Sequence, residues 1–472
     1  MNGNVFDLFR SHWAVAPDRQ FLVPTNGAAR TYRQIDERSG QFAAALRHRG
    51  VTPGARVVTQ IDKSTDAVAI YLACLRIGAV YVPLNTSYTS AEVDYFVSDA
   101  EPQVLVTTST LGDLVAEADD AEPWMEVETR LADDLAAMIY TSGTTGRSKG
   151  AMVTHANLAS NALTLHAIWR FTPGDVLLHV LPIYHVHGLF VALHTAMLNA
   201  STVLFCSRFD VDQSIELMSE ATVMMGVPTH YIRLLAQPDF GPEACSKMRL
   251  FTSGSAPMTS AVHEDFTSRT GHTILERYGM SEAGMITSNP YEGERVPGTV
   301  GFPLPGVQLR VMANESPCKP GEVGIVQTKG PNLFAGYWRQ DDKTAESFSD
   351  DWFITGDVGS VDDEGRLTLE GRSGDMIISG GLNIYPREIE MVLDEHPSVL
   401  ESAVVGLPDP DLGESVVAFV VCSNEAEAVD IEAVSDAARE RLAGFKVPRR
   451  YEILDELPRN SMGKVQKSRL RA

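Results

Sequence analysis

The hydrophobic pattern in the first half of the chain alternates between the helical period and short apolar runs. Apolar positions recur with helical spacing in three segments, residues 39–49, 66–78 and 90–98. Apolar runs typical of buried strands lie beside them, at residues 56–61, 80–84 and 103–107. The same rhythm returns at residues 176–205 and 221–252. This alternation predicts an α/β fold whose large N-terminal domain is built on doubly wound, mostly parallel sheets.

The pattern changes near residue 303. Residues 303–371 hold short strand-like runs separated by Gly, Pro and Asp turns, which predicts a β subdomain. Residues 374–472 return to mixed helix and strand signals, as in a small α+β domain. We therefore expect an N-terminal domain of residues 1–373 and a C-terminal domain of residues 374–472. Residues 110–134 are acidic and weakly periodic, and we expect a solvated connection there.

Composition narrows the class of protein. The chain has 472 residues, 44% of them apolar and 21% charged, as in soluble proteins with more than one domain. A net charge of −23 argues against nucleic acid or an anionic membrane as a partner. The five cysteines lack paired spacing, and we find no signal-peptide pattern and no apolar run long enough to span a membrane. We therefore expect a cytoplasmic protein in which any anion site is built locally.

Residues 140–150 carry the most specific chemical pattern. They follow an apolar run and precede another, so the pattern predicts a strand, a loop rich in Gly, Ser and Thr, and a second strand. Gly143 and Gly146 permit positive φ, so that backbone N–H groups and hydroxyls can turn toward one anion, while Lys149 supplies a positive charge. This arrangement suits a phosphate. The spacing differs from the P-loop of kinases and GTPases, and the alternative is a flexible surface loop.

Later motifs are less specific when each is taken alone. His185 and His187 end a strand before an apolar helix, and such a pair can also ligate a metal. Residues 250–257 predict a strand that enters a tight turn, without the spacing of a hydrolase nucleophile. Asp357 follows a glycine, as in an ordinary turn, and residues 458–467 read alone as a basic tail.

Taken together and in order, these motifs resemble the adenylate-forming superfamily, which contains acyl-CoA synthetases, luciferases and peptide-synthetase adenylation domains. The resemblance extends over essentially the whole chain. It implies that a carboxylate attacks the α-phosphate of ATP to give an acyl-adenylate and pyrophosphate. The C-terminal domain then rotates, and the thiol of coenzyme A displaces AMP. The implied cofactors are ATP, Mg²⁺ and coenzyme A.

The resemblance also assigns roles to residues. Lys464, Glu282 and Lys149 would be catalytic, Glu282 and Thr141 would hold Mg²⁺, and Gly380 and Gly381 would line the passage of coenzyme A. The nucleotide would contact Thr141, Ser142, Gly143, Thr144, Thr145, Gly146, Lys149, Gly254, Ser255, Ala256, Arg277, Tyr278, Gly279, Met280, Ser281, Asp357 and Arg372.

The resemblance gives a more detailed role to Tyr278, Asp357 and Gly374. In the family the tyrosine at position 278 stacks on adenine, although core packing is the alternative for Tyr278. Asp357 would accept both ribose hydroxyls, assisted by Arg372. Gly374 stands at the family's hinge, where relatives usually have Asp or Lys, and the alternative is a static turn that needs positive φ.

Within the superfamily, the segments 183–189, 226–233, 277–282 and 287–290 are most similar to malonyl-CoA synthetases, which must bind a second carboxylate. The residues for this small dicarboxylate would be His187, Arg233, Arg277, Ser255 and Met280. A fatty-acyl pocket has no use for a buried arginine, because an unpaired buried cation is costly. Alternatively, both arginines pair with Glu276 or Glu282.

Other substrates and a non-enzyme remain open. Methylmalonate, or another small acid such as oxalate, fits the same motifs. An amino-acid adenylation domain fits less well, because Tyr184 and His185 stand where those domains carry an Asp that binds the amine. A non-catalytic nucleotide-binding relative would have lost charges, whereas Lys149, Glu282 and Lys464 are all present.

Overall fold

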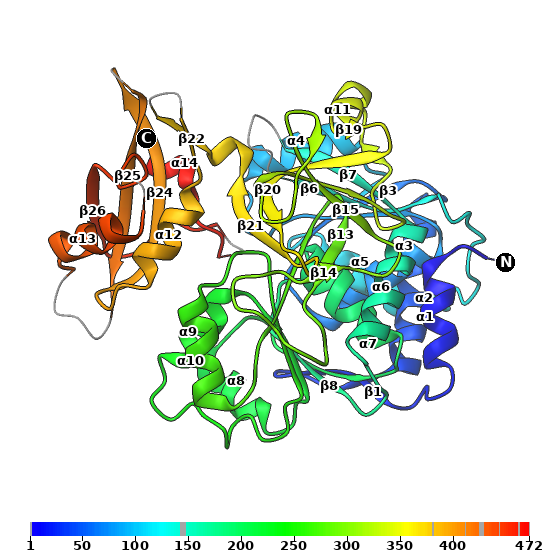
Figure 1. The fold of residues 1–472 in the computed structure, drawn as a ribbon. Coiled ribbons are helices and arrows are strands. Elements are labelled where there is room, and N and C mark those ends of the chain that lie inside the picture. The colour runs from blue at the N-terminus through cyan, green and yellow to red at the C-terminus, as the bar shows by residue number, and fades with distance from the viewer. Residues whose placement is uncertain are drawn as a thin grey trace.

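The computed structural model describes residues 2–141, 148–379, 382–410, 412–423, 429–442, 444–460 and 463–471. Figure 1 shows a large body that contains the N-terminus and a smaller C-terminal part beside it. The α/β class and the mostly parallel sheets of the body confirm the expected fold class. Among the described residues, no helix is both long and apolar enough to cross a membrane.

The larger sheet of the body is parallel in its centre and antiparallel at both edges. Its strands, in spatial order, are β14 (Phe302–Pro303), β13 (Gly284–Ser288), β12 (Leu275–Met280), β11 (Leu250–Ser253), β10 (Val223–Gly226), β8 (Val176–His179), β9 (Thr202–Phe205), β1 (Gln20–Pro24) and β2 (Arg30–Thr31). The carboxyl ends of the parallel strands β8, β10 and β11 therefore meet at one edge, where ligands bind in open α/β sheets.

The second sheet carries the predicted phosphate loop. Its order is β18 (Gly336–Tyr337), β7 (Lys149–Thr154), β6 (Leu135–Thr141), β4 (Val80–Pro83), β3 (Arg56–Gln60) and β5 (Val104–Thr107). The strands β6 and β7 form an antiparallel hairpin, as residues 140–150 predict, and β18 pairs with β7 from far along the chain.

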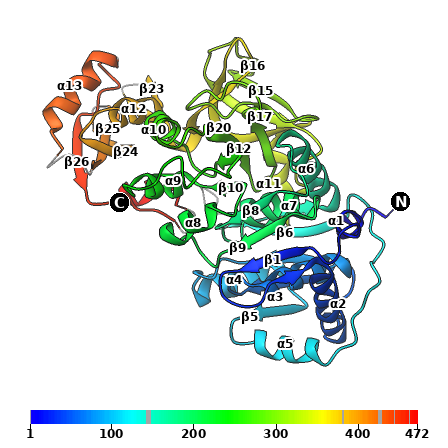
Figure 2. The same ribbon diagram turned by 90° about the horizontal axis from the view of Figure 1, so that it is seen from below.

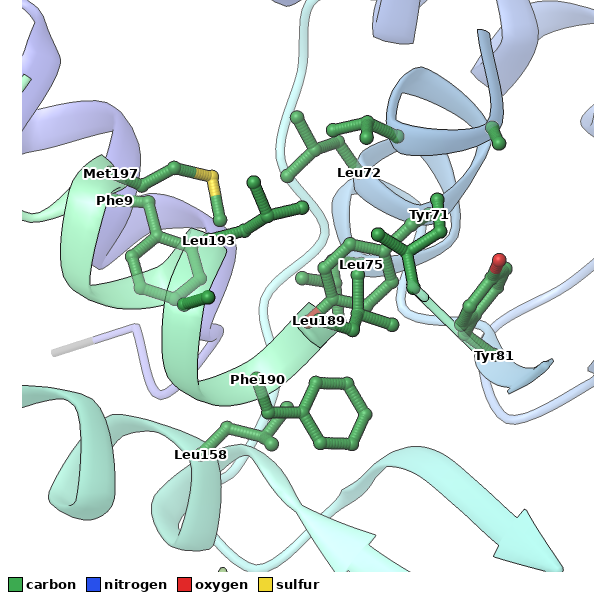
Figure 3. Packing of buried hydrophobic residues seen from close by; sticks show 14 of the residues in the cluster. Phe9, Tyr71, Leu72, Leu75, Tyr81, Leu158, Leu189, Phe190, Leu193 and Met197 are labelled. Atoms are coloured by element: carbon green, nitrogen blue, oxygen red, sulfur yellow. The ribbon is translucent and has the colours of Figure 1, made fainter. Parts of the chain in front are cut away.

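Helices cover both sheets and separate them. They are α1 (Val5–Trp13), α2 (Tyr32–His48), α3 (Thr65–Arg76), α4 (Ser90–Ala100), α5 (Leu111–Asp119), α6 (His155–Ile168), the π-helix η1 (His187–Leu193), α7 (His194–Met197), α8 (Val211–Met218), α9 (Pro228–Leu235) and α10 (Ser260–Thr270). The helix α3 is buried on almost every side, because it lies in the middle of this core. Figure 3 shows its Tyr71, Leu72 and Leu75 near Leu189 and Leu193 of η1.

The β subdomain is an antiparallel sheet. Its strands are β16 (Ser316–Pro317), β15 (Gln308–Ala313), β17 (Gly324–Lys329), β20 (Trp352–Val361) and β19 (Phe348–Ser349), with β21 (Leu367–Arg372) paired to β20 and α11 (Asp341–Glu346) nearby. The pairing of β20 with both neighbours is irregular around Asp357, next to Gly356 with φ +72°.

The C-terminal part follows the short 3-10 helix η2 (Ser373–Asp375) and has its own core. It contains β22 (Ile377–Ser379), β23 (Leu382–Ile384), α12 (Pro386–Asp394), β24 (Val399–Asp409), β25 (Gly413–Cys422), α13 (Ile431–Arg441), β26 (Arg450–Leu454) and α14 (Lys467–Leu470). Figure 2 shows α12 next to α10 of the body. There, Nη2 of Arg387 donates to the carbonyl oxygen of Met258 at 3.1 Å.

Two expectations from the pattern are wrong in detail. Residues 110–134 are not only a solvated connection, because α5 lies within them and buries Leu114 and Ala118, with Glu117 paired to Arg49 at 2.7 Å. Asp357 is not in a turn but within β20, where the pairing with β17 is interrupted between Ile354 and Val358 and the carboxylate contacts Tyr278 and Arg372. Tertiary packing is the reason in the case of α5: its apolar face is narrow, and the acidic residues around it mask the helical pattern in the sequence.

Candidate active site

Asp357 is held by two partners at the irregular point of β20. Its Oδ2 accepts a hydrogen bond from the hydroxyl of Tyr278, and its Oδ1 lies 2.7 Å from Nε of Arg372. Burial alone would lower the pKa of Arg372, but Asp357, Tyr278 and Glu282 raise it above its ordinary value. A carboxylate fixed in this way is suited to accept hydrogen bonds from a diol.

Tyr278 has the core packing that was the alternative for it, and it makes one contact that the sequence did not predict. Its ring packs in an apolar cluster with Ile286, Val311 and Val326, while its hydroxyl contacts Asp357. Burial, followed by the charge of Asp357, raises the pKa of Tyr278, so the hydroxyl stays protonated and donates. Contact with adenine stays a prediction.

Lys464 lies beside this cluster although it comes from the C-terminal part. Its backbone N–H donates to Oδ1 of Asn460 at 3.0 Å in a tight loop. Burial and the charge of Arg372 lower the pKa of Lys464, and the charge of Asp357 opposes this shift. The structure thus brings Lys464, Arg372 and Asp357 together from distant parts of the chain.

Glu282 and Lys149 are joined by a residue that the sequence did not single out. The hydroxyl of Tyr337 donates to Oε1 of Glu282 at 3.0 Å, and Nζ of Lys149 lies 4.5 Å from the centre of the Tyr337 ring. Tyr337 belongs to β18, which is a short strand without a polar motif, so no signal in the sequence points to it. The pairing of β18 with β7 brings Tyr337 to this site.

The phosphate loop is described only at its two ends. Thr141 ends β6 and Lys149 begins β7, and the carbonyl oxygen of Ser148 accepts a hydrogen bond from the hydroxyl of Tyr95 at 2.7 Å. The expected nucleotide and coenzyme A contacts that lie outside the described residues are Ser142, Gly143, Thr144, Thr145, Gly146, Gly380 and Gly381.

The carboxylate of Glu282 is suited to bind a hard metal ion that also binds phosphate oxygens. It is 7% exposed and uses only one oxygen for Tyr337 among the hydrogen bonds of the described residues. Within the same residues, no group of three or more His, Cys, Asp and Glu side chains could hold a metal without a ligand. Because Mg²⁺ usually binds one or two carboxylates together with phosphate oxygens and water, one free carboxylate oxygen is sufficient.

Arg277 is a buried cation at the carboxyl ends of the central strands. Its side chain is 3% exposed, and within the described residues its Nε and Nη2 have no hydrogen-bond partner. Burial lowers its pKa to about 10, so that it is still charged at neutral pH. A Cβ atom at Gly254 would lie only 2.3 Å from Nη1 of Arg277. Glycine at position 254 therefore makes the room that the guanidinium occupies.

His187 lies near this guanidinium. Its Nδ1 is 3.3 Å from the hydroxyl oxygen of Ser255, which has the uncommon φ of +71°, and within the described residues its Nε2 is unpaired. Burial, followed by the charge of Arg277, lowers the pKa of His187 well below its usual range, so the ring is neutral. When Nδ1 accepts from Ser255, Nε2 carries the proton and is a free donor.

The structure contradicts two expectations about the arginines: a buried position for Arg233, and an ion pair of Arg277 with Glu276 or Glu282. Arg233 is exposed on α9, so it does not share the buried position of Arg277. Among the described residues, Arg277 makes no ion pair with Glu276 or Glu282. Glu276 instead accepts from the backbone N–H of Gly298, and burial raises its pKa to about 8. Sequence position could not separate the two arginines, because only the direction of each side chain does so.

The remaining predicted contacts line the turns around these groups. Ala256 follows Ser255 in the turn after β11, and Met280 and Ser281 lie at the tip of the β12–β13 hairpin. A Cβ atom at Gly279 would lie 2.2 Å from the carbonyl oxygen of Gly284, so glycine is needed for this hairpin to close.

The chain is similar to known enzymes over its whole length. Residues 9–338 match the family described as AMP-binding enzyme, and residues 388–464 match the AMP-binding enzyme C-terminal domain. A malonate–CoA ligase of Arabidopsis thaliana is 33% identical over 100% of this chain and 89% of its own. A feruloyl-CoA synthase of Amycolatopsis sp is 34% identical over 95% of each chain.

Two solved structures of one relative match the whole chain. ATP-bound MatB from Rhodopseudomonas palustris is 45% identical and superposes with a TM-score of 0.97 over 100% of this chain and 98% of that chain. The apo form of the same protein gives 0.87 over the same shares. At equal identity and coverage, the structure described here is therefore closer to the ATP-bound form than to the apo form. The chain belongs to the AMP-binding enzyme family and is an acyl-CoA synthetase of the adenylate-forming type.

Proposed function

We propose that this enzyme makes malonyl-CoA from malonate, ATP and coenzyme A through a malonyl-adenylate, with release of pyrophosphate and AMP. The observation that carries the proposal is the buried guanidinium of Arg277, which has no carboxylate partner among the described residues. An unpaired buried cation costs stability, and this cost is offset when a substrate supplies the missing negative charge.

A dicarboxylate meets two different needs in such a site. One carboxylate must stay free to attack the α-phosphate, while the other pairs with Arg277. The unpaired Nε2 of His187 is a further donor for the second carboxylate. Hydrogen bonds between a guanidinium and a carboxylate are stronger than neutral ones, and they fix the orientation of the acid. An uncharged acyl chain would leave Arg277 unpaired.

Adenylation would then depend on charge and position. The attacking carboxylate is already a nucleophile, so the enzyme has to hold it in line and stabilise the charge that develops on the phosphate. We assign this to Lys464 and Lys149, with Glu282 as the ligand for Mg²⁺, which would neutralise part of the phosphate charge. Asp357 and Arg372 would hold the ribose, and Thr141 would assist at the metal.

A pyrophosphate-release assay with coenzyme A tests the proposal directly. Malonate, methylmalonate, oxalate, succinate, acetate, octanoate and ferulate are compared at equal concentrations. We expect malonate to give the highest kcat/KM, followed by methylmalonate. A higher kcat/KM with acetate, octanoate or ferulate would show that Arg277 does not select a second carboxylate.

We also propose that Gly374 is the hinge for the rotation of the C-terminal part. In this arrangement Gly374 lies in η2 without positive φ, and a Cβ atom there would meet nothing within 4 Å. The static turn that would need glycine is therefore not present. The wide φ and ψ range of glycine is then of use only when the domain rotates.

Proline at this position should separate the two half-reactions. Gly374→Pro fixes φ at about −65°, a value also found in 3-10 helices. We expect adenylate formation to continue while thioester formation from a supplied acyl-adenylate falls by about tenfold or more. Gly374→Lys, the residue of some relatives, is the control and should retain both steps. Equal losses in both half-reactions, or unchanged turnover in the proline variant, would place the hinge elsewhere.

A further inference from the structure

Lys63 lies outside every motif of the proposed reaction, on the loop between β3 and α3. Its Nζ is 2.7 Å from Nδ1 of His179, 2.9 Å from the carbonyl oxygen of His179 and 2.9 Å from that of Leu181. The ammonium also lies 4.4 Å from the centre of the Phe205 ring. Lys63 therefore links the sheet that carries the phosphate loop to the end of β8 in the larger sheet.

The hydrogen bonds define the protonation of this pair. Nε2 of His179 is 2.9 Å from the carbonyl oxygen of Gly188, which can only accept, so Nε2 carries the proton. Nδ1 is then the acceptor and Lys63 the donor. Burial, followed by the charge of Lys63, lowers the pKa of His179 and keeps the ring neutral. Burial also lowers the pKa of Lys63, but only the ammonium has the three protons that its three acceptors require.

The two residues hold both ends of the segment that leads to His187. Lys63 binds the carbonyl oxygen of Leu181 at its start, and His179 binds that of Gly188 at its end. The segment folds back tightly, because a Cβ atom at Gly188 would lie 2.0 Å from the carbonyl oxygen of Pro182. On the other side, Leu189 and its neighbours in η1 are packed in the core.

We propose that Lys63 is a positioning residue, which sets, through His179 and Leu181, the place of His187 at the end of the site that receives the acid. The proposal rests on the proposed function, because it assigns His187 to the second carboxylate. A desolvated cation contributes little to the free energy of folding, since apolar residues of similar volume often give equal or greater stability. Three directed hydrogen bonds instead fix the geometry of the loop.

The test compares Lys63→Met with Tyr71→Phe. Methionine keeps the length of the side chain but removes all three hydrogen bonds. We expect the KM for malonate to rise about 10- to 100-fold, as for a binding group that moves by about 1 Å. The KM for ATP should stay within about twofold of the wild-type value, because a change confined to the acid pocket removes no contact with the nucleotide.

The Tyr71→Phe variant is the matched control for loosened packing. It removes a buried hydrogen bond of 2.7 Å between the Tyr71 hydroxyl and Nε2 of His194, on the core side of the helix that follows His187. We expect a lower melting temperature and no selective rise in the KM for malonate. Should Lys63→Met not fold, Lys63→Gln, which keeps a neutral donor, should show a smaller rise of the same selective kind.

Two results would overturn the proposal: an unchanged KM for malonate in a folded Lys63→Met protein, or equal rises in the KM for malonate and for ATP. Failure of the proposed function is recognised separately. In that case the wild-type enzyme prefers another acid, and the same comparison of KM values for that acid and for ATP then decides whether Lys63 positions the loop.

Discussion

Lys464→Ala should lower the rate of adenylate formation by about 100- to 1,000-fold, while the variant still converts supplied malonyl-adenylate and coenzyme A to the thioester. The reason is geometric. Lys464 belongs to the C-terminal part and lies near Arg372 and Asp357 in this structure, which is closer to the ATP-bound form of the relative than to its apo form. If this part rotates for the second step, as proposed, the lysine leaves the site, and its loss should then spare thioester formation.

Single-turnover assays of each half-reaction measure this separation. Lys319→Ala, which changes an exposed lysine of the β subdomain, is the control and should leave both rates unchanged. Comparable losses in both half-reactions of Lys464→Ala would show that the lysine supports the fold or both steps alike.

The pH dependence gives a second readout for the same residue. The pKa of Lys464 is lowered from its ordinary value of 10.5, mainly by burial and by Arg372. The ammonium therefore loses its proton at a lower pH than an ordinary lysine does. We expect the rate of adenylate formation to fall as the pH rises through this shifted pKa, and this alkaline decline should be absent from the residual activity of Lys464→Ala.

Arg277→Met should raise the KM for malonate far more than the KM for ATP. The loss of a desolvated pair with the second carboxylate corresponds to about 2–5 kcal/mol, or roughly 30- to 5,000-fold in affinity. Methionine fills most of the volume, so the effect reports the charge rather than a cavity. Because the unpaired cation is costly in the absence of substrate, the melting temperature of the free variant should not fall.

Arg233→Met is the matched control for this prediction. Arg233 is exposed on α9, and the same substitution there should change the KM for malonate by less than about tenfold. Gly254→Ala tests the position of Arg277 without removing its charge, since the new Cβ would lie 2.3 Å from Nη1. It should also raise the KM for malonate. An equal response of both arginine variants would mean that charge on this face, rather than the buried guanidinium, attracts the acid.

Local sequence patterns predicted most of the elements, because the apolar faces of strands and helices repeat with their own periods. The helices α3 and α4 begin within a residue of the positions predicted from the segments 66–78 and 90–98. The exceptions are elements that depend on distant partners. The helix α5 is acidic and weakly periodic, yet Leu114 and Ala118 are buried against other parts of the fold.

The motifs also pointed to the chemistry, because the residue types of the site are unusual in their order. Lys464, Asp357, Arg372 and Tyr278 could be named before their contacts were known, and the structure brings them together. Tyr337 could not be named, because an isolated tyrosine in a short strand carries no chemical signal. Its role between Glu282 and Lys149 depends on a strand pairing across nearly 200 residues.

The sequence by itself determined the α/β class, the family and the set of charged groups available for adenylate chemistry, since these follow from local periodicity and from residue types in a fixed order. Only the tertiary structure decided which arginine is buried without a partner, and which lysine holds the segment before His187. Burial, pairing and the direction of a side chain arise where distant segments meet. Arg233 and Arg277 have equal charge in the sequence, and the low-dielectric surroundings of one of them create the difference.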